Sequence, residues 1–245
     1  MRILQTILII FFFYTAIPAI SQGQNPDSAL VAQQRKNPVQ LYYNSLGIQS
    51  GLYNGSEYTV YVHLLKDGHP YLDTTKLMDG AVFYDGMLYR NVPMLYDIVK
   101  DELVIQHYNK VFHIQLIKSK VDEFNILGRP FLHLGKDSTI QGSVKNGYYE
   151  VLYDGQIKLY AKRIKTIQEF IPDMQVERRV FSNNRYFIYK DSTFHEVYNQ
   201  SSVLKILKDK KFDYKQALRK QRIKFRKQRE TAMKLMLQQY ENANH

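Results

Sequence analysis

The residues best equipped for chemistry in this sequence are its histidines. His107 and His113 flank Asn109-Lys110, and a chain reversal there would bring two imidazoles close enough to share a metal ion. None of the others has the i, i+4 spacing of a zinc-binding helix or another familiar ligand spacing. Two cross-strand side chains on a wet face explain the pair better, so no metal site is predicted. The remaining histidines are His63, His69, His133, His195 and His245.

A cluster of carboxylates follows Tyr96. Asp97, Asp101 and Glu102 could supply the two acids of a glycosidase, but such clusters more often cap or solvate a turn. The sequence holds no GxSxG elbow, no glycine-rich phosphate loop and no cysteine. Catalysis is therefore the less favoured interpretation, and no catalytic residue or cofactor is predicted. A hydrolase acting on polysaccharide or peptidoglycan is the alternative.

A run of six basic residues gives the strongest functional signal. Thirteen Lys and Arg against four acids lie between Ser201 and His245, so 9 of the 11 net positive charges fall in this tail. Such asymmetry is typical of a surface that meets phosphate, anionic lipid or acidic glycan. The alternative is a solvated face of helices that pack on the rest of the protein. The six candidate binding residues are Lys220, Arg222, Lys224, Arg226, Lys227 and Arg229.

The first two dozen residues indicate where the protein works. Arg2 precedes an unbroken apolar run from Ile7 to Phe13, and small residues follow at Ala19 and Ser21. We interpret residues 1–23 as a signal peptide, because the apolar run is too short to span a bilayer and polar residues follow at once. Export makes nucleic acid an improbable partner. It favours phospholipid, lipopolysaccharide, acidic glycan or another envelope protein, with no transmembrane span after cleavage.

The middle of the chain is dominated by turn signals. The remaining chain of about 220 residues is long enough for a substantial core, and its tyrosines, phenylalanines, valines and isoleucines favour strands. Between Ile48 and Val197, pairs of Asn or Asp with Gly recur, and both residue types accept the positive φ of tight hairpin turns. Each pair is a candidate reversal. They are Asn54-Gly55, Asp67-Gly68, Asp79-Gly80, Asp85-Gly86, Asn146-Gly147 and Asp154-Gly155.

The flanking residues predict particular hairpins. Val82 to Tyr84 should pair with Met87 to Tyr89, and Tyr149 to Tyr153 with Gln156 to Tyr160. Two further pairs are expected, around Asn109-Lys110 and around Asn183-Asn184. No long helical run separates the segments, so a parallel α/β sheet is unsuited to this pattern. The predicted fold class is mainly β with helical ends (α+β), an antiparallel meander forming a curved sheet, a sandwich or a partly open barrel. Strands this short and irregularly charged argue against a barrel in the outer membrane.

Helices are expected at both ends of the β domain, which we assign to residues 48–200. Residues 24–47 should hold a polar lead and one short helix, begun by Asn37-Pro38 and stopped by Gly47. In the basic helical segment, residues 201–245, Ser201 and Ser202 can cap a first helix and a second should begin near Asp213. We favour a break before the last helix, because Ile223 and Phe225 would lie outside its apolar stripe. The predicted stripe consists of Ala232, Met233, Met236, Leu237 and Tyr240.

Four triplets begin with Asp followed by Ser or Thr and resemble an O-glycosylation acceptor of some Gram-negative bacteria. Turn chemistry explains them equally well. The hydroxyl residues concerned are Ser28, Thr74, Ser138 and Ser192.

Several longer segments resemble a family of exported proteins of unknown function from Bacteroidota. The resemblance implies export, a Gram-negative envelope and a shared fold, and it transfers no site residue, activity or cofactor. Where those proteins have an Asn-containing turn between the tail helices, this chain has Arg222-Ile223-Lys224. The segments are LYNGSEY (52–58), KDGHPYL (66–72), GAVFYDGMLYRNVPMLYDIVKDELV (80–104), YYEVLYDGQIKLYAKRIK (148–165) and SVLKILKDKKFDYKQALRKQRIKFRKQRE (202–230).

The sequence thus favours an exported protein of the periplasm or outer envelope that acts as a non-catalytic binding or assembly module. A second alternative to this function makes the tail a docking element for another envelope protein.

Overall fold

The computed structural model describes residues 51–136, 144–208 and 213–242. All of them belong to one compact unit of the chain. The expected signal peptide (1–23), the polar lead and short helix (24–47), Ser28, Ser138 and His245 lie outside the described residues.

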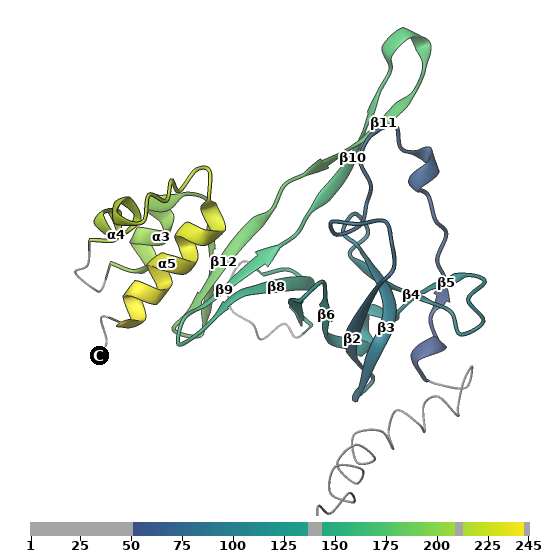
Figure 1. The fold of residues 1–245 in the computed structure, drawn as a ribbon, viewed down its shortest axis with the longest axis horizontal. Coiled ribbons are helices and arrows are strands. Elements are labelled where there is room, and N and C mark those ends of the chain that lie inside the picture. The colour runs from purple at the N-terminus through teal and green to yellow at the C-terminus, as the bar shows by residue number, and fades with distance from the viewer. Residues whose placement is uncertain (1–50, 137–143, 209–212, 243–245) are drawn as a thin grey trace, which may run out of the picture. The chain divides into compact units, whose positions relative to one another are not determined.

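One large antiparallel sheet forms the body of the described chain (Figure 1), which confirms the predicted mainly β, α+β class. Its order is β1-β5-β4-β3-β2-β6-β7-β8-β9-β12-β13, and β1 and β13 are the two ends of an open sheet. The strands are β1 (Ser56–Glu57), β2 (Met78–Tyr84), β3 (Met87–Asp97), β4 (Glu102–Gln106), β5 (His113–Gln115), β6 (Val121–Ile126), β7 (Arg129–Leu134), β8 (Gly147–Asp154), β9 (Lys158–Lys162), β12 (Arg185–Lys190) and β13 (Thr193–Val197).

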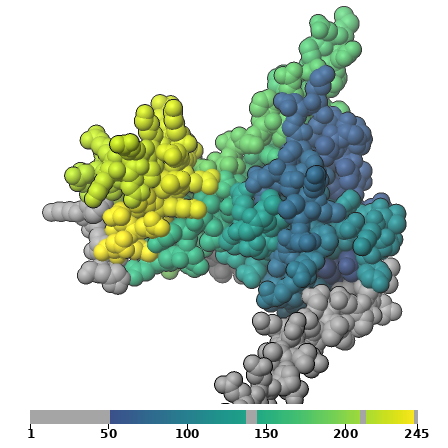
Figure 2. All heavy atoms as spheres, viewed as in Figure 1, coloured from purple at the N-terminus to yellow at the C-terminus, as the bar shows by residue number. Residues whose placement is uncertain are grey.

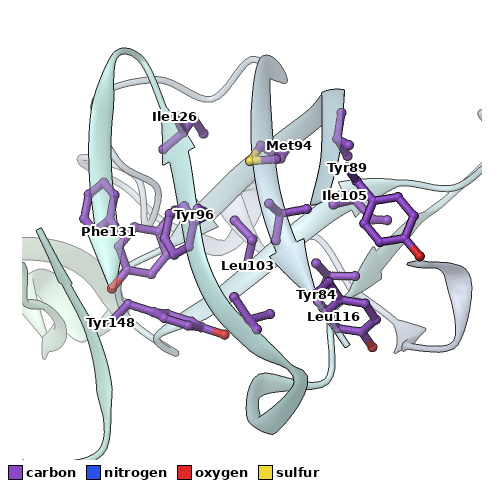
Figure 3. Close-up of a cluster of buried hydrophobic side chains, with 14 of the residues drawn as sticks. Tyr84, Tyr89, Met94, Tyr96, Leu103, Ile105, Leu116, Ile126, Phe131 and Tyr148 are labelled. Carbon is purple, nitrogen blue, oxygen red and sulfur yellow. The ribbon is translucent and has the colours of Figure 1, made fainter. Parts of the chain in front are cut away.

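The most abrupt departure of the sheet from a simple meander follows β5, where the sheet curls. After β5 the chain returns to pair β6 with β2, on the far side of β4, β3 and β2, and only residues 116–120 make the connection. In a flat sheet β5 and β6 would lie four strand spacings apart, about 19 Å at about 4.8 Å each. Three of the five linking residues form the tight turn η4 (Lys118–Lys120), so the link is too short for a flat sheet and fits a curled one. Strands β2 to β8 therefore surround one apolar cluster, in which Tyr96 contacts the rings of Phe124, Phe131 and Tyr148 (Figure 3).

Two of the predicted hairpins have the expected partners and turn positions. Tyr84 pairs with Met87 across Asp85-Gly86, where both φ angles are positive as a two-residue turn requires. Strands β4 and β5 pair around Asn109-Lys110. Strands β8 and β9 also pair, but Asp154 opposes Lys158, so the connection has three residues and the predicted Asp154-Gly155 turn is wrong in register.

The hairpin predicted around Asn183-Asn184 is wrong. Strand β11 (Glu177–Ser182) pairs with β10 (Lys165–Phe170), while β12 pairs with β9 and β13. The backbone N–H of Asn183 donates to the carbonyl of Ile164, so this segment continues the pairing of a long hairpin and does not reverse. The reversal occurs instead at η5 (Pro172–Met174), where Asp173 and Met174 have positive φ.

Several glycines expected in turns serve close packing. Gly80 lies inside β2, and a Cβ there would collide with the carbonyl oxygen of Asn125 and the sulfur of Met94. Gly55 is followed by β1, and its missing side chain lets that strand approach Gln115 of β5. Two tight turns were missed by the search for Asn-Gly and Asp-Gly pairs. They are Leu127-Gly128 and Asp191-Ser192, each with two positive φ angles.

The tail contains three helices among its described residues: α3 (Gln200–Ile206), α4 (Tyr214–Lys220) and α5 (Arg229–Asn242). Helix α4 begins next to Asp213 as predicted, and Asp213 is its N-cap. Asn199, not Ser201 or Ser202, is the N-cap of α3, with Ser202 completing a capping box. The expected break is confirmed, since Gln221 to Gln228 are not helical. None of the described helices is long and apolar enough to cross a membrane.

The five residues of the predicted apolar stripe are all buried. Together with Val203, Leu207 and Leu218 they pack against Leu152, Leu159 and Ile188 of the sheet, forming a second apolar cluster. The helices therefore share a core with strands β8, β9 and β12.

Candidate functional site

The six basic residues predicted from the sequence occupy the connection between α4 and α5. Lys220 ends α4, Arg229 begins α5, and the other four lie between them. Arg222 has positive φ, which ends the helix, and the N–H of Ile223 donates back to the carbonyl of Leu218. Ile223 and Phe225 pack against the second apolar cluster. The intervening residue Lys224 and its basic neighbours are exposed, so this connection, residues 220–229, forms a cationic ridge.

The charges of the cationic ridge face solvent. All six side chains are exposed, and within the described part of the chain none of them forms an ion pair with a carboxylate. Arg229 lies over the ring of Tyr186 with its guanidinium carbon 5.7 Å from the ring centroid. Unpaired cations on an ordered connection are available to an anionic partner.

A buried ionic network fixes the first turn of α5 to the sheet. Arg163, directly after β9, donates from Nε to Glu150 on β8 at 2.6 Å and from its terminal nitrogens to both carboxylate oxygens of Glu230 on α5. Arg129 of β7 binds the other side of Glu150, and the Tyr186 hydroxyl donates to Glu230 at 2.9 Å. Arg163 and Glu150 are each less than a tenth exposed. The two buried charges compensate each other, with Arg129 as a second cation beside Glu150 and Glu230 as a second carboxylate beside Arg163.

The last turn of α5 is anchored by a second carboxylate. Glu241 accepts a hydrogen bond from the Tyr153 hydroxyl at 2.5 Å and another from the backbone N–H of Ile157 at 3.0 Å. The absence of a side chain at Gly155 leaves room for this carboxylate, because a Cβ there would collide with it. Helix α5 is thus held at both ends, and the cationic ridge begins directly before its first turn.

The sequence analysis missed this network, although strand alternation contains a signal for it. Leu159, Ala161 and Arg163 share one face by period two, and the first two are fully buried, so the third is directed inward. Glu150 stands in the same way between Tyr148 and Leu152 on β8. A charged residue on an inward strand position needs a buried partner.

The carboxylates considered for catalysis have structural partners. Asp97 is fully buried, accepts hydrogen bonds from the hydroxyls of Tyr58 and Tyr61 at 2.7 Å, and caps its own turn through the N–H of Lys100. Burial, followed by the hydrogen bonds to Tyr71 and Asp97, raises the pKa of Tyr58, so its hydroxyl remains a donor. The turn-capping interpretation is confirmed for Asp97.

Asp101 lies on the other side of the turn in an ion-pair cluster. It accepts hydrogen bonds from Tyr96 at 2.6 Å and from the ammonium groups of Lys118 and Lys162 at 2.6 and 2.7 Å. Burial alone would raise the pKa of Asp101, but the charge of Lys162 and the hydrogen bonds outweigh it, so the pKa is lowered. Gly147 leaves room for this pair, since a Cβ would meet both charged groups. Glu102 makes no hydrogen bond through its buried Oε2 within the described residues.

The histidines do not gather into a metal site. His107 is buried, lies 2.6 Å from the Asn109 side-chain oxygen and stacks on Phe112, so the expected wet face is wrong for this residue. His133 is buried with both ring nitrogens in hydrogen bonds. Within the described ranges, no group of three or more His, Cys, Asp or Glu could hold a metal ion.

Two surface grooves border the tail helices. One of about 830 Å³ lies beside α4 and is lined by Asp213, Gln216, Arg219, Lys220 and Gln239. Another, of about 740 Å³, lies between α3 and β13 and includes Lys205 and Lys208. The first groove borders the cationic ridge, because Lys220 belongs to both.

Comparison with known proteins identifies no relative: no family model, no curated protein and no solved structure matches this chain.

The Arg163 network predicts a large and specific loss of stability. Replacing Arg163 with Met, which keeps the length of the side chain, leaves Glu150 buried beside Arg129 alone and releases Glu230. We expect Arg163→Met to lower the free energy of unfolding by about 3 kcal/mol, as for breaking a buried ion pair. Urea denaturation followed by circular dichroism measures this change.

Arg178 provides the matched control, because its pair with Glu169 is exposed. Arg178→Met should change the free energy of unfolding by less than about 1 kcal/mol. Equal losses in the two variants would contradict the special role of the Arg163 network.

The lowered carboxyl pKa values predict acid sensitivity. The pKa of Asp101 is lowered as described; burial alone would raise the pKa of Glu230, but its bonds to Arg163 lower it. The unfolded chain therefore binds more protons, and stability rises with pH across this range. The contribution is complete above about pH 5 and is lost as pH falls below about 4. Unfolding free energies measured from pH 7 to pH 3 should fall less steeply in Asp101→Asn than in the wild type; identical slopes would exclude this origin.

Proposed function

We propose that this chain is an exported cell-envelope protein that acts as a non-catalytic binding or assembly module. Its β sheet and tail helices form one scaffold, and the cationic ridge meets an anionic surface: phospholipid, lipopolysaccharide phosphate or acidic glycan. The observation that carries this proposal is the exposure of six cations on the connection between α4 and α5, none of which pairs with a carboxylate in the part of the chain that the structure describes.

The contrast with other basic residues supports a binding role. Arg129, Arg163 and Lys162 are paired with carboxylates inside the protein, whereas none of the six ridge cations forms an ion pair with a described carboxylate. A ridge that served only for solubility would not need its backbone anchored by Ile223 and Phe225. Rigid placement reduces the entropy lost when a partner binds.

The proposal of export depends on the signal-like N-terminus and on the resemblance to exported Bacteroidota proteins. Both concern sequence features, and both favour envelope lipids and glycans over nucleic acid.

The alternatives differ in the support they receive. A docking role for another envelope protein would use the same ridge and its neighbouring groove. It differs from the present proposal only in the partner, which would be a protein and not a lipid or glycan. For a hydrolase, the carboxylates considered are poorly suited, because Asp97 is fully buried and Asp101 is tied to two lysines.

Neutralising the ridge should weaken binding to anionic vesicles. Each basic residue near an anionic membrane surface contributes about 1 kcal/mol. The triple variant Lys224→Gln, Arg226→Gln, Lys227→Gln should therefore bind vesicles of phosphatidylglycerol and phosphatidylcholine, mixed in equal parts, about 100-fold more weakly at low salt. Co-sedimentation of the full chain measures the affinity, and added salt should weaken the wild type. Purified lipopolysaccharide and heparin replace the vesicles in parallel assays.

The control removes the same charge elsewhere, with Lys76→Gln, Arg90→Gln and Lys205→Gln, all at exposed positions. An equal loss in this control, or no binding of the wild type to any of the three probes, would contradict the proposal.

Export is tested separately. The natural protein should fractionate with the envelope and begin near residue 22 to 24; recovery with cytosolic enzymes and an intact Met1 would refute export.

A further inference from the structure

The hairpin of β10 and β11 carries a cluster of exposed apolar side chains at its end. Six residue pairs join the two strands, and the hairpin projects beyond the neighbouring described segments (Figures 1 and 2). Met174 is 98% exposed and Ile171 71% exposed. Phe170 and Val176 are also exposed, so four large exposed apolar residues lie within residues 170–176, which we call the apolar tip. Phe181 is exposed as well, but it pairs with Thr166 near the base of the hairpin.

The end of the hairpin has less support than its strands. A two-stranded hairpin is marginally stable in water, and here the segment at Lys66 and Asp67 runs along the outer edge of β11. The N–H of Lys66 donates to the carbonyl of Arg178, the N–H of Val180 donates to the carbonyl of Asp67, and the Lys66 ammonium lies 3.6 Å from Glu177. The hairpin therefore has support along β11, and its turn residues 170–176 lie beyond these contacts. Most of its side chains are exposed on both faces. Burying apolar surface of this kind against a partner lowers the free energy, and its projection makes it accessible.

The charges of the hairpin are paired below the tip. Arg178 binds Glu169 at 2.8 Å, and Arg179 binds Glu177 at 2.8 Å while lying over the ring of Phe170. In residues 170–176 the one charged side chain is Asp173, which occupies a positive-φ position of the turn. The tip therefore presents apolar surface with a nearly neutral collar.

Size and shape distinguish the kinds of partner. A stable interface with a protein or a second copy takes about 20 to 30 residues from each side, far more than this narrow convex tip provides. A bilayer interface imposes no matching shape and accepts a few apolar side chains at headgroup depth. The Asp173 carboxylate opposes deeper insertion, while Arg178 and Arg179 can exchange their exposed pairs for lipid phosphates.

We propose that the apolar tip inserts into the interfacial region of a lipid bilayer. This inference rests on the proposed function only because it takes an envelope surface as the partner. It uses none of the residues of the cationic ridge. A weak apolar contact and an electrostatic contact together bind a membrane far better than either alone.

A single fluorescent label provides the direct test, because the chain contains no cysteine. Full-length Met174→Cys, labelled with nitrobenzoxadiazole, is mixed with pure phosphatidylcholine vesicles at high salt, where the cationic ridge contributes little. We expect a blue-shifted and brighter emission. Val111→Cys is the matched control, since Val111 is 81% exposed on another turn, and its emission should stay that of the aqueous protein.

A second measurement uses loss of apolar surface. Ile171→Ser with Val176→Ser should lower vesicle binding at least tenfold, whereas Val111→Ser with Leu64→Ser should leave it unchanged. No spectral change at Met174, or equal binding by the tip variant and the wild type, would overturn the inference. Such a failure leaves the cationic ridge untouched, because the ridge is tested on anionic vesicles with different variants. A spectral change that requires an added protein, with none on vesicles, would likewise overturn the lipid assignment in favour of a protein partner.

Discussion

The ionic contact of Arg163 with Glu150 and Glu230 is the constraint on which the rest of the structure depends. On β8, Tyr148 belongs to the cluster inside the curled sheet and Leu152 to the cluster under the helices, and Glu150 lies between them. The network therefore occupies the junction of two apolar cores. A buried guanidinium is costly unless its N–H groups are all paired. Glu150 pairs one edge of Arg163 and Glu230 pairs the other, so α5 must lie where Glu230 reaches Arg163. The apolar residues of α5 provide the free energy that holds the helix on the sheet. The ion pair between Glu230 and Arg163 determines where along the sheet the helix lies.

That constraint links the fold to the proposed work of the tail. Because α5 is held by Glu230 at its start and Glu241 at its end, the cationic ridge is presented from a fixed support. The apolar tip belongs to the same chain segment, since the strand that leads to Arg163 continues into β10. Binding at either surface thus acts on elements that share the Arg163 junction. The two surfaces offer different chemistry, one cationic and one apolar, which suits a bilayer with anionic headgroups.

Local rules predicted the parts of the fold that depend on local chemistry. The Asp85-Gly86 turn, the start of α4 near Asp213 and the stripe of α5 follow from positive φ, helix-start signals and helical spacing. The Asn183-Asn184 turn failed because tertiary pairing keeps Asn183 bonded to Ile164 across a long hairpin. Gly80, Gly147 and Gly155 carry a turn signal in sequence, but each is small because another group approaches its backbone. The six basic residues lie within ten positions of the sequence and are visible there as a charge run, whereas the Arg163 network joins residues far apart in the chain and requires the fold to be seen.

Native-state hydrogen exchange of α5 tests the central claim most directly. If the Arg163 network and the shared core join α5 to the sheet, the amides from Ala232 to Tyr240 should exchange with the same opening free energy as those of β8 and β9, through global unfolding. Exchange of α5 at a much lower opening free energy, while β8 and β9 stay protected, would show that the helix opens independently and would contradict the account.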